Sequence, residues 1–137
     1  MQEKEYTLNS EGVLNIVGNI RIITESPFKN NKDIKSVIIH NSIYIEDSMF
    51  EDCSNLVSLK ILNDVISISN SAFKGCSSLN LVDFNSELIN IGENAFYRCS
   101  NLQSIIIPDY VRTISKNAFN QCTKLESVTI NSTDVEI

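Results

Sequence analysis

The stretch Ile91-Gly92-Glu93-Asn94-Ala95-Phe96-Tyr97-Arg98-Cys99-Ser100-Asn101-Leu102 contains three landmarks that recur along the chain. Its phenylalanine belongs to a series spaced by 22 and then 23 residues: Phe28, Phe50, Phe73, Phe96 and Phe119. A cysteine stands three residues after each of the last four: Cys53, Cys76, Cys99 and Cys122. An aliphatic residue stands six residues after all five: Ile34, Leu56, Leu79, Leu102 and Leu125. This period predicts a stack of near-identical units, because each unit can bury its apolar face only against its neighbours.

Fixed apolar and variable positions alternate in the second half of each unit. The apolar positions, nine and eleven residues after each phenylalanine, are Val37 and Ile39, Leu59 and Ile61, Val82 and Phe84, Ile105 and Ile107, and Val128 and Ile130. The position between them varies: Ile38, Lys60, Asp83, Ile106 and Thr129. This alternation predicts a short strand with one buried face. Since the strand recurs in every unit, the strands are expected to stack in parallel, about 4.8 Å apart.

A second short extended segment precedes each phenylalanine, as in residues 65–68, 88–91 and 111–114. It carries an isoleucine five residues before the phenylalanine, at Ile23, Ile45, Ile68, Ile91 and Ile114. The Ser71 or Asn94 side chain before Ala-Phe is expected to accept hydrogen bonds from the free N–H groups of a helical turn. The six residues from there to the cysteine leave room for one tight turn, expected to be 3₁₀. Each coil is thus predicted to contain two short strands and a helical turn.

The first 19 residues differ from the repeats that follow in residues 20–137. Residues 6–18 read as two alternating strands joined at Ser10-Glu11-Gly12, which is typical of a β-hairpin. Such a hairpin laid over the first coil would cover the strand edge that a parallel stack otherwise exposes. We therefore predict an N-terminal cap at 1–19 and one continuous repeat domain at 20–137.

The repeats resemble the BspA-like, or treponemal-type, leucine-rich repeat, in which Ile-Gly is followed by Ala-Phe, Cys, Leu and an apolar strand that ends in Pro. Residues 91–102 and 104–108 carry this pattern, and the resemblance covers about residues 20–137. Gly92 and Pro108 each occur in only one repeat, Met49 replaces Ala, and Pro27 and Asn31 replace Ala and Cys in the first unit. Residues 6–18 resemble the N-terminal cap of the family. We predict a right-handed leucine-rich-repeat solenoid, mostly β, of about five coils.

The resemblance also implies a role, because BspA-like proteins are often surface or secreted adhesion proteins that bind host or matrix proteins. The first residues, MQEKEYTLNS, lack the apolar stretch of a signal peptide. The resemblance therefore implies the cell surface or secretion, whereas the N-terminus is also consistent with the cytoplasm.

Composition excludes several classes of function. The chain has 137 residues, 42% of them hydrophobic, and a formal net charge of −6, so nothing in its charge favours nucleic acid or an anionic membrane. No apolar run approaches the roughly 18 residues of a membrane span, and no membrane insertion is expected.

The four cysteines invite a metal or redox interpretation. Zinc ligands are usually closely spaced, whereas these cysteines recur once per coil, which favours a buried row of small apolar side chains. We expect them to be reduced and free of metal. The single histidine, His40, has no catalytic partners in the pattern and is expected in a solvated turn. Glu46, Asp47, Glu51 and Asp52 lack the spacing of a calcium loop. No enzyme and no cofactor are predicted.

Binding is expected on the concave face of the strands, where solenoids commonly bind partners. The candidate contact residues are the variable row Ile38, Lys60, Asp83, Ile106 and Thr129. The predicted function is a non-catalytic module that binds a protein partner. A glycan-binding role would require aromatic platforms, which the concave face lacks.

The C-terminal end suggests an alternative role. After Ile130 the chain continues through residues 131–137 as the first half of a further repeat and then stops. Either further repeats follow, or another subunit covers the last coil. The alternative prediction is therefore a structural or assembly module that forms a homo-oligomer through this end.

Overall fold

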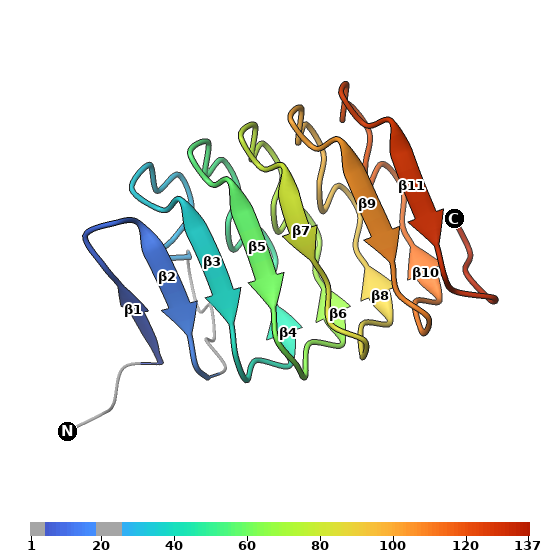
Figure 1. The fold of residues 1–137 in the computed structure, drawn as a ribbon, viewed down its shortest axis with the longest axis horizontal. Helices are drawn as coiled ribbons and strands as arrows, with labels where there is room; N and C mark the ends of the chain where they lie inside the picture. Colours follow the sequence, from blue (N-terminus) through green and yellow to red (C-terminus); the bar gives the residue numbers. More distant parts are fainter. Residues whose placement is uncertain (1–4, 19–25) are drawn as a thin grey trace.

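The computed structural model, which describes residues 5–18 and 26–137, is a right-handed solenoid of stacked coils (Figure 1). The predicted leucine-rich-repeat architecture is confirmed. Its strands are β1 (Tyr6–Leu8), β2 (Val13–Ile16), β3 (Ser36–Ile39), β4 (Tyr44–Ile45), β5 (Ser58–Ile61), β6 (Ser67–Ile68), β7 (Leu81–Asp83), β8 (Asn90–Ile91), β9 (Ser104–Ile107), β10 (Thr113–Ile114) and β11 (Ser127–Ile130).

The longer strands of the coils up to β7 form the main sheet. Strands β2, β3, β5 and β7 pair in parallel, and the register brings equivalent residues together, as in Val37 beside Leu59 and Ile38 beside Lys60. The apolar members point inward, so that Val37 and Leu59 are buried. The period in the sequence thus becomes a set of rows along the solenoid, with one residue from each coil.

An antiparallel hairpin of β1 and β2 covers the first coil, as predicted. Gly12 in its turn has a φ of 84°, and a Cβ atom there would lie 2.5 Å from the Asp33 carbonyl oxygen. This position therefore requires glycine. Tyr6 of β1 packs edge-on against the ring of Phe28, with 4.9 Å between the ring centroids. The hairpin consequently covers both the strand edge and the end of the phenylalanine row. The predicted boundary between residues 19 and 20 lies outside the described residues.

The shorter strands form a second parallel sheet on the other side of each coil, in the order β10-β8-β6-β4. Ile45, Ile68, Ile91 and Ile114 point inward from these strands and are buried. The remaining member of this predicted row, Ile23, lies outside the described residues. Each coil therefore has two strands that enclose a single apolar core.

The predicted 3₁₀ turns are wrong, because the segments around each phenylalanine are successive β-turns. Ser48 and Asp52 have φ values of 55° and 59°, and the equivalent residues of the next three coils also have positive φ. This alternation sends every second N–H group to the following coil, as from Phe50 N to Ala72 O at 2.7 Å. The intervening N–H groups close local turns, as from Cys53 N to Phe50 O at 3.2 Å. A 3₁₀ helix would direct all of these groups within one coil.

The five phenylalanines form a continuous stack through the core. Adjacent ring centroids are 5.4, 5.2, 5.2 and 5.3 Å apart, and the rings lie within 13° of parallel. Phe28, Phe50, Phe73 and Phe96 are buried, whereas Phe119 in the last coil is half-buried. Stacked rings at such distances add to the stabilisation from burial alone.

The main sheet is interrupted between β7 and β9, where an unbroken parallel stack was predicted. Strands β9 and β11 form a separate two-stranded sheet. Phe84 occupies the inward position that Ile39, Ile61 and Ile107 take in other coils, and its ring packs edge-on against Phe96, 5.8 Å between centroids. Strand β7 ends at Asp83, one residue earlier than the equivalent position in β5 and β9, so Phe84 lies just beyond it. The interruption divides the molecule's largest strand surface.

Candidate protein-binding face

The outward faces of the main sheet and of the β9–β11 sheet, which point away from the core, are together called here the open sheet face. The predicted contact row lies along it, and Lys60, Asp83, Ile106 and Thr129 are exposed. Ile38 is half-buried rather than fully exposed, because it pairs with Asn15 of the hairpin cap. The structure therefore places all five residues in one row, with the apolar contribution concentrated at Ile106.

The strand positions two residues before and two residues after this row differ in how far their side chains are exposed. On one side, Leu81 is 64% exposed, and the Ser36 and Ser58 hydroxyl groups lie 2.8 Å apart. On the other side, Asn85 is buried and donates to the Val65 carbonyl oxygen at 2.9 Å. His40 is half-buried, and its Nε2 lies 3.0 Å from Asn15 Oδ1, so it is not simply a solvated turn residue.

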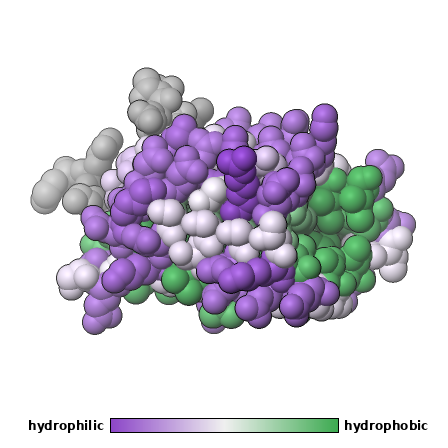
Figure 2. All heavy atoms as spheres, turned by 90° about the horizontal axis from the view of Figure 1, so that it is seen from above, coloured by the Kyte–Doolittle hydropathy of each residue, from purple (hydrophilic) through white to green (hydrophobic). Residues whose placement is uncertain are grey.

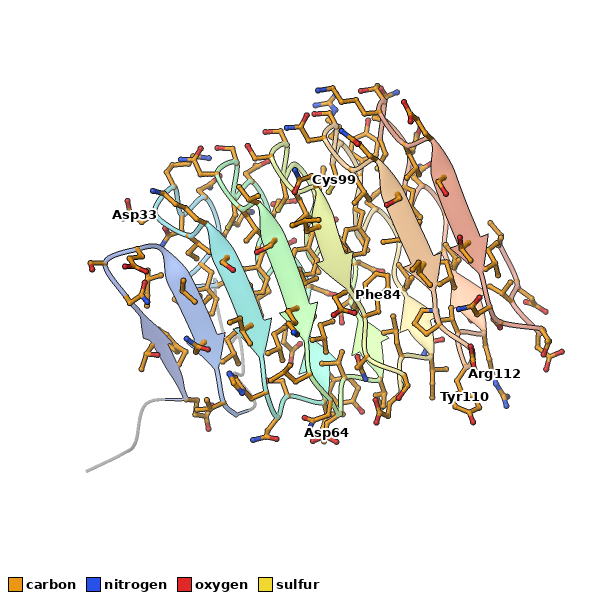
Figure 3. All side chains as sticks on the ribbon, viewed as in Figure 1. Asp33, Asp64, Phe84, Cys99, Tyr110 and Arg112 are labelled. Atoms are coloured by element: carbon orange, nitrogen blue, oxygen red, sulfur yellow. The ribbon has the colours of Figure 1, made fainter. Side chains whose placement is uncertain are left out.

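A cleft of about 250 Å³ opens at the interruption of the sheet. Its lining includes Val82, Asp83 and Phe84 on one side and Ile106 and Pro108 on the other. Figure 3 places Phe84 between the end of β7 and β9. Leu81 and Ile106, 64% and 58% exposed, lie on the two strands that border the interruption. The open sheet face thus has an apolar centre beside a hollow.

The four cysteines are buried inside the coils as free thiols: Cys53, Cys76, Cys99 and Cys122. Each Sγ donates to the phenylalanine carbonyl oxygen of the preceding coil, at 3.0 to 3.3 Å. Burial raises the pKa of Cys53 and of Cys122 to about 11, from an ordinary value near 9.0. Burial raises the pKa of Cys76 and of Cys99 as well. The cysteine row therefore joins coils and stays protonated at neutral pH.

The acidic residues of one turn have structural partners. Glu51 forms an ion pair with Lys29 at 2.8 Å, and Asp47 Oδ1 accepts a hydrogen bond from the Asn70 N–H at 3.1 Å. Among the described residues, no three His, Cys, Asp or Glu side chains lie together as a metal site. In the same part of the chain, no helix is long and apolar enough to cross a membrane.

Comparison with known proteins defines the repeat. The sequence matches the BspA type leucine rich repeat region in six copies, over residues 7–57 and 43–137. The chain belongs to the BspA-type leucine-rich-repeat family. No curated protein matches the chain significantly.

Solved structures share this BspA-type fold. A leucine-rich-repeat protein of T. pallidum superposes with a TM-score of 0.72 at 22% identity, over 90% of this chain and 66% of that one. A leucine-rich-repeat protein of Bacteroides ovatus gives a TM-score of 0.71 at 25% identity, over 94% and 40%. A leucine-rich-repeat protein of Eubacterium ventriosum gives 0.64 at 22% identity, over 91% and 41%. The chain therefore spans less than two thirds of each of these proteins.

Sequence reasoning missed a second surface of this BspA-type solenoid. Ile43, Ile66 and Ile89 stand seven residues before successive phenylalanines and form a row at the corner of the coils. Tyr110 and Arg112 lie together at the same edge of the molecule in Figure 3. The recurrence of isoleucine was a visible signal, but the adjoining strands have only two residues each, too few for an alternation to show which side chains face outward.

Proposed function

We propose that this BspA-type solenoid is a non-catalytic module that binds a protein through its open sheet face. The observation that carries the proposal is the exposed Ile106 side chain in the lining of the cleft, with the exposed Leu81 on β7, the other strand that borders the sheet interruption. Exposed apolar groups that gather in one place are typical of contact surfaces. Membership of the family supports the same general role.

The polar members of the face supply specificity in this proposal. Lys60 and Asp83 are adjacent in the register of β5 and β7, and both are exposed. An apolar centre with charged residues at its rim resembles protein interfaces in general. The proposed partners are host or matrix proteins, as the adhesion role common among BspA-like proteins implies.

Replacing Ile106 with arginine is expected to abolish capture of a matrix protein by the immobilised module, because a charge would replace the apolar contact at the cleft. The free energy of unfolding should change by no more than about 0.5 kcal/mol, as is usual for exposed positions. Surface plasmon resonance with a panel of purified matrix proteins measures the first effect, and urea denaturation measures the second.

Two matched variants locate the binding face. Lys60→Ala should weaken capture, whereas Ile89→Ser, on the other side of the coils, should leave it unchanged. Loss of capture in Glu51→Ala and Arg98→Ala, with full capture by Ile106→Arg, would show that the turn side binds instead.

A second candidate function is assembly through the C-terminal coil. Val128 and Ile130 of β11 are 52% and 41% exposed, although their equivalents Ile105 and Ile107 are buried. Figure 2 shows hydrophobic residues gathered toward this end of a surface that is otherwise mostly hydrophilic. Strand β11 pairs with β9 on one side, and its other edge has no partner strand among residues 5–18 and 26–137. Unpaired edges of this kind readily pair with another chain.

If a second copy covers this end, the molecular mass measured by light scattering should rise from monomer to dimer as concentration increases. Replacing both Val128 and Ile130 with lysine should keep the protein monomeric at all concentrations, because the charges would prevent burial of the edge. A wild-type chain that remains monomeric at high concentration would exclude the assembly role.

A further inference from the structure

The corner of the solenoid that leads into the second sheet presents a regular apolar row with an acidic border. The isoleucine row consists of Ile43, Ile66 and Ile89. Backbone hydrogen bonds hold these residues in register, from Ile66 N to Ile43 O and from Ile89 N to Ile66 O, both at 2.9 Å. Ile43 is 40% exposed, and Ile66 and Ile89 are half-buried. The row therefore remains accessible along three coils.

A groove of about 430 Å³ extends from this row toward the C-terminal end. Ile66 and Ile89 line it together with Tyr110, Arg112 and Glu87. Tyr110 is 69% exposed, more than any other aromatic side chain among the exposed large hydrophobics of the described chain. Tyrosine and arginine, with tryptophan, are the residues enriched among those that dominate binding energy at protein interfaces. The groove is thus lined by residues suited to holding a peptide.

The border of the row is acidic. Asp64 and Glu87 occupy equivalent positions in successive coils, two residues before Ile66 and Ile89, and both are exposed. A hydrogen bond from the Asn85 side chain lowers the pKa of Glu87, so this carboxylate stays ionised near neutral pH. Arg112 occupies the next position of the row and places a positive charge at its C-terminal end. Beside Ile66 and Ile89 the border is acidic, and with the chain's net charge of −6 it favours a basic partner over an acidic one there.

The spacing of the row selects the secondary structure of its partner. Adjacent hydrogen-bonded strands are about 4.8 Å apart, so the three isoleucines of the row, on three successive coils, span about 9.6 Å. Apolar residues at positions i, i+4 and i+7 of an α-helix span about 10.5 Å. Alternate residues of an extended strand would span about 13.6 Å over the same three positions. A helix therefore matches the row and a strand does not.

We propose that the isoleucine row and its groove form a second docking surface, separate from the open sheet face, for an amphipathic α-helix with an aliphatic stripe and a Lys- or Arg-rich flank. The stripe packs on Ile43, Ile66 and Ile89, Tyr110 covers one end of it, and the basic flank lies against Asp64 and Glu87. This mode of recognition needs no change in the backbone of the solenoid.

The test uses a synthetic helical peptide with leucine at positions i, i+4 and i+7 and lysine along one flank, titrated into the protein and followed by fluorescence anisotropy. Two control peptides have the same length. One distributes the leucines around the helix, and the other replaces the lysines with glutamates. The lysine peptide should bind at least about tenfold more tightly than either control.

Variants of the protein then test the surface. Ile89→Lys should weaken binding of the lysine peptide by about tenfold or more. Asp64→Asn with Glu87→Gln should weaken it by about threefold and reduce its salt dependence. Asparagine tolerates the positive φ of Asp64, and glutamine keeps an oxygen for Asn85, so the second variant is expected to fold normally. Ile106→Arg, on the open sheet face, should have no effect.

Several results would overturn the proposal. Absence of binding by the lysine peptide would do so, and so would equal binding of either control peptide. Unchanged binding in the Asp64→Asn, Glu87→Gln variant would show that the acidic border has no part, even if Ile89→Lys failed to fold. None of these results bears on matrix-protein capture by the open sheet face.

Discussion

Truncation of Phe96 to alanine is expected to lower the free energy of unfolding by about 3–5 kcal/mol, as in other buried phenylalanine truncations. The Phe96 ring is fully buried, stacks on Phe73 and Phe119, and receives the edge of Phe84. Its removal would leave a cavity bordered by three rings that cannot all move to fill it. Chemical denaturation with urea measures the change.

Tyr97→Ala provides the matched control, because Tyr97 is the next residue but its ring points outward between Lys74 and Arg98. Its ring lies 5.8 Å from Lys74 Nζ and 5.3 Å from Arg98 Cζ. Loss of these contacts should cost about 1 kcal/mol or less. If Phe96→Ala also cost less than about 1 kcal/mol, the phenylalanine stack would not be the centre of the core.

The second large effect is expected at alkaline pH. Burial holds the thiol pKa of Cys53 and Cys122 at about 11, above the ordinary value near 9.0, and raises those of Cys76 and Cys99 in the same direction. Unfolded thiols therefore ionise first as the pH rises. For Cys53 and Cys122, the stabilisation associated with the protonated thiol is complete below about pH 9 and is lost progressively between about pH 9 and pH 11. For Cys76 and Cys99, the loss also begins near pH 9 and proceeds in the same direction. Above pH 9, each thiol should lower the free energy of unfolding by about 1.4 kcal/mol per pH unit.

The free energy of unfolding is measured by urea denaturation at a series of pH values from about 7 to about 11. Cys99→Ala supplies the control, because all ionisable side chains other than Cys99 are the same in both proteins. Above pH 9, the free energy of unfolding of the variant should fall less steeply than that of the wild type. The difference in slope should be about 1.4 kcal/mol per pH unit, which corresponds to one proton. Equal slopes for the two proteins would show that Cys99 is ionised as readily in the folded state as in the unfolded state.

Most of the fold could be predicted from the repeat. The spacing of Phe50, Phe73 and Phe96 indicated a solenoid, and the alternation around Lys60 indicated which strand residues face outward. Such predictions succeed because equivalent residues of adjacent coils contact each other, so the period in the sequence directly reports a contact in space. The hairpin cap was equally readable, since Gly12 marks its turn.

The turn geometry could not be predicted from the same landmarks. Six residues with an asparagine or serine before Ala-Phe are compatible with a helical turn or with successive β-turns. The choice depends on the N–H groups of one coil, such as Ser71 N, reaching carbonyl oxygens of the next, such as Glu93 O at 2.9 Å. Those acceptors exist only after the coils have stacked.

The details of the candidate surfaces also depend on stacking. Phe84 looks like one more apolar strand residue, yet its ring and the early end of β7 accompany the interruption and the cleft beside Ile106. Asn85 looks like an exposed strand end, but the corner of the preceding coil buries it against Val65.

The sequence by itself therefore determined the repeat, its inward rows of phenylalanine, cysteine and isoleucine, and the cap, because these features recur and pack against copies of themselves. Only the tertiary structure decided the β-turn geometry, the interruption at Phe84 and the accessible isoleucine row beside Asp64 and Glu87. These features depend on how one coil differs from the next, or on how far a half-buried side chain is exposed at a corner. Both the difference between coils and this exposure arise from contacts between neighbouring coils, which a repeating pattern of residue types does not describe.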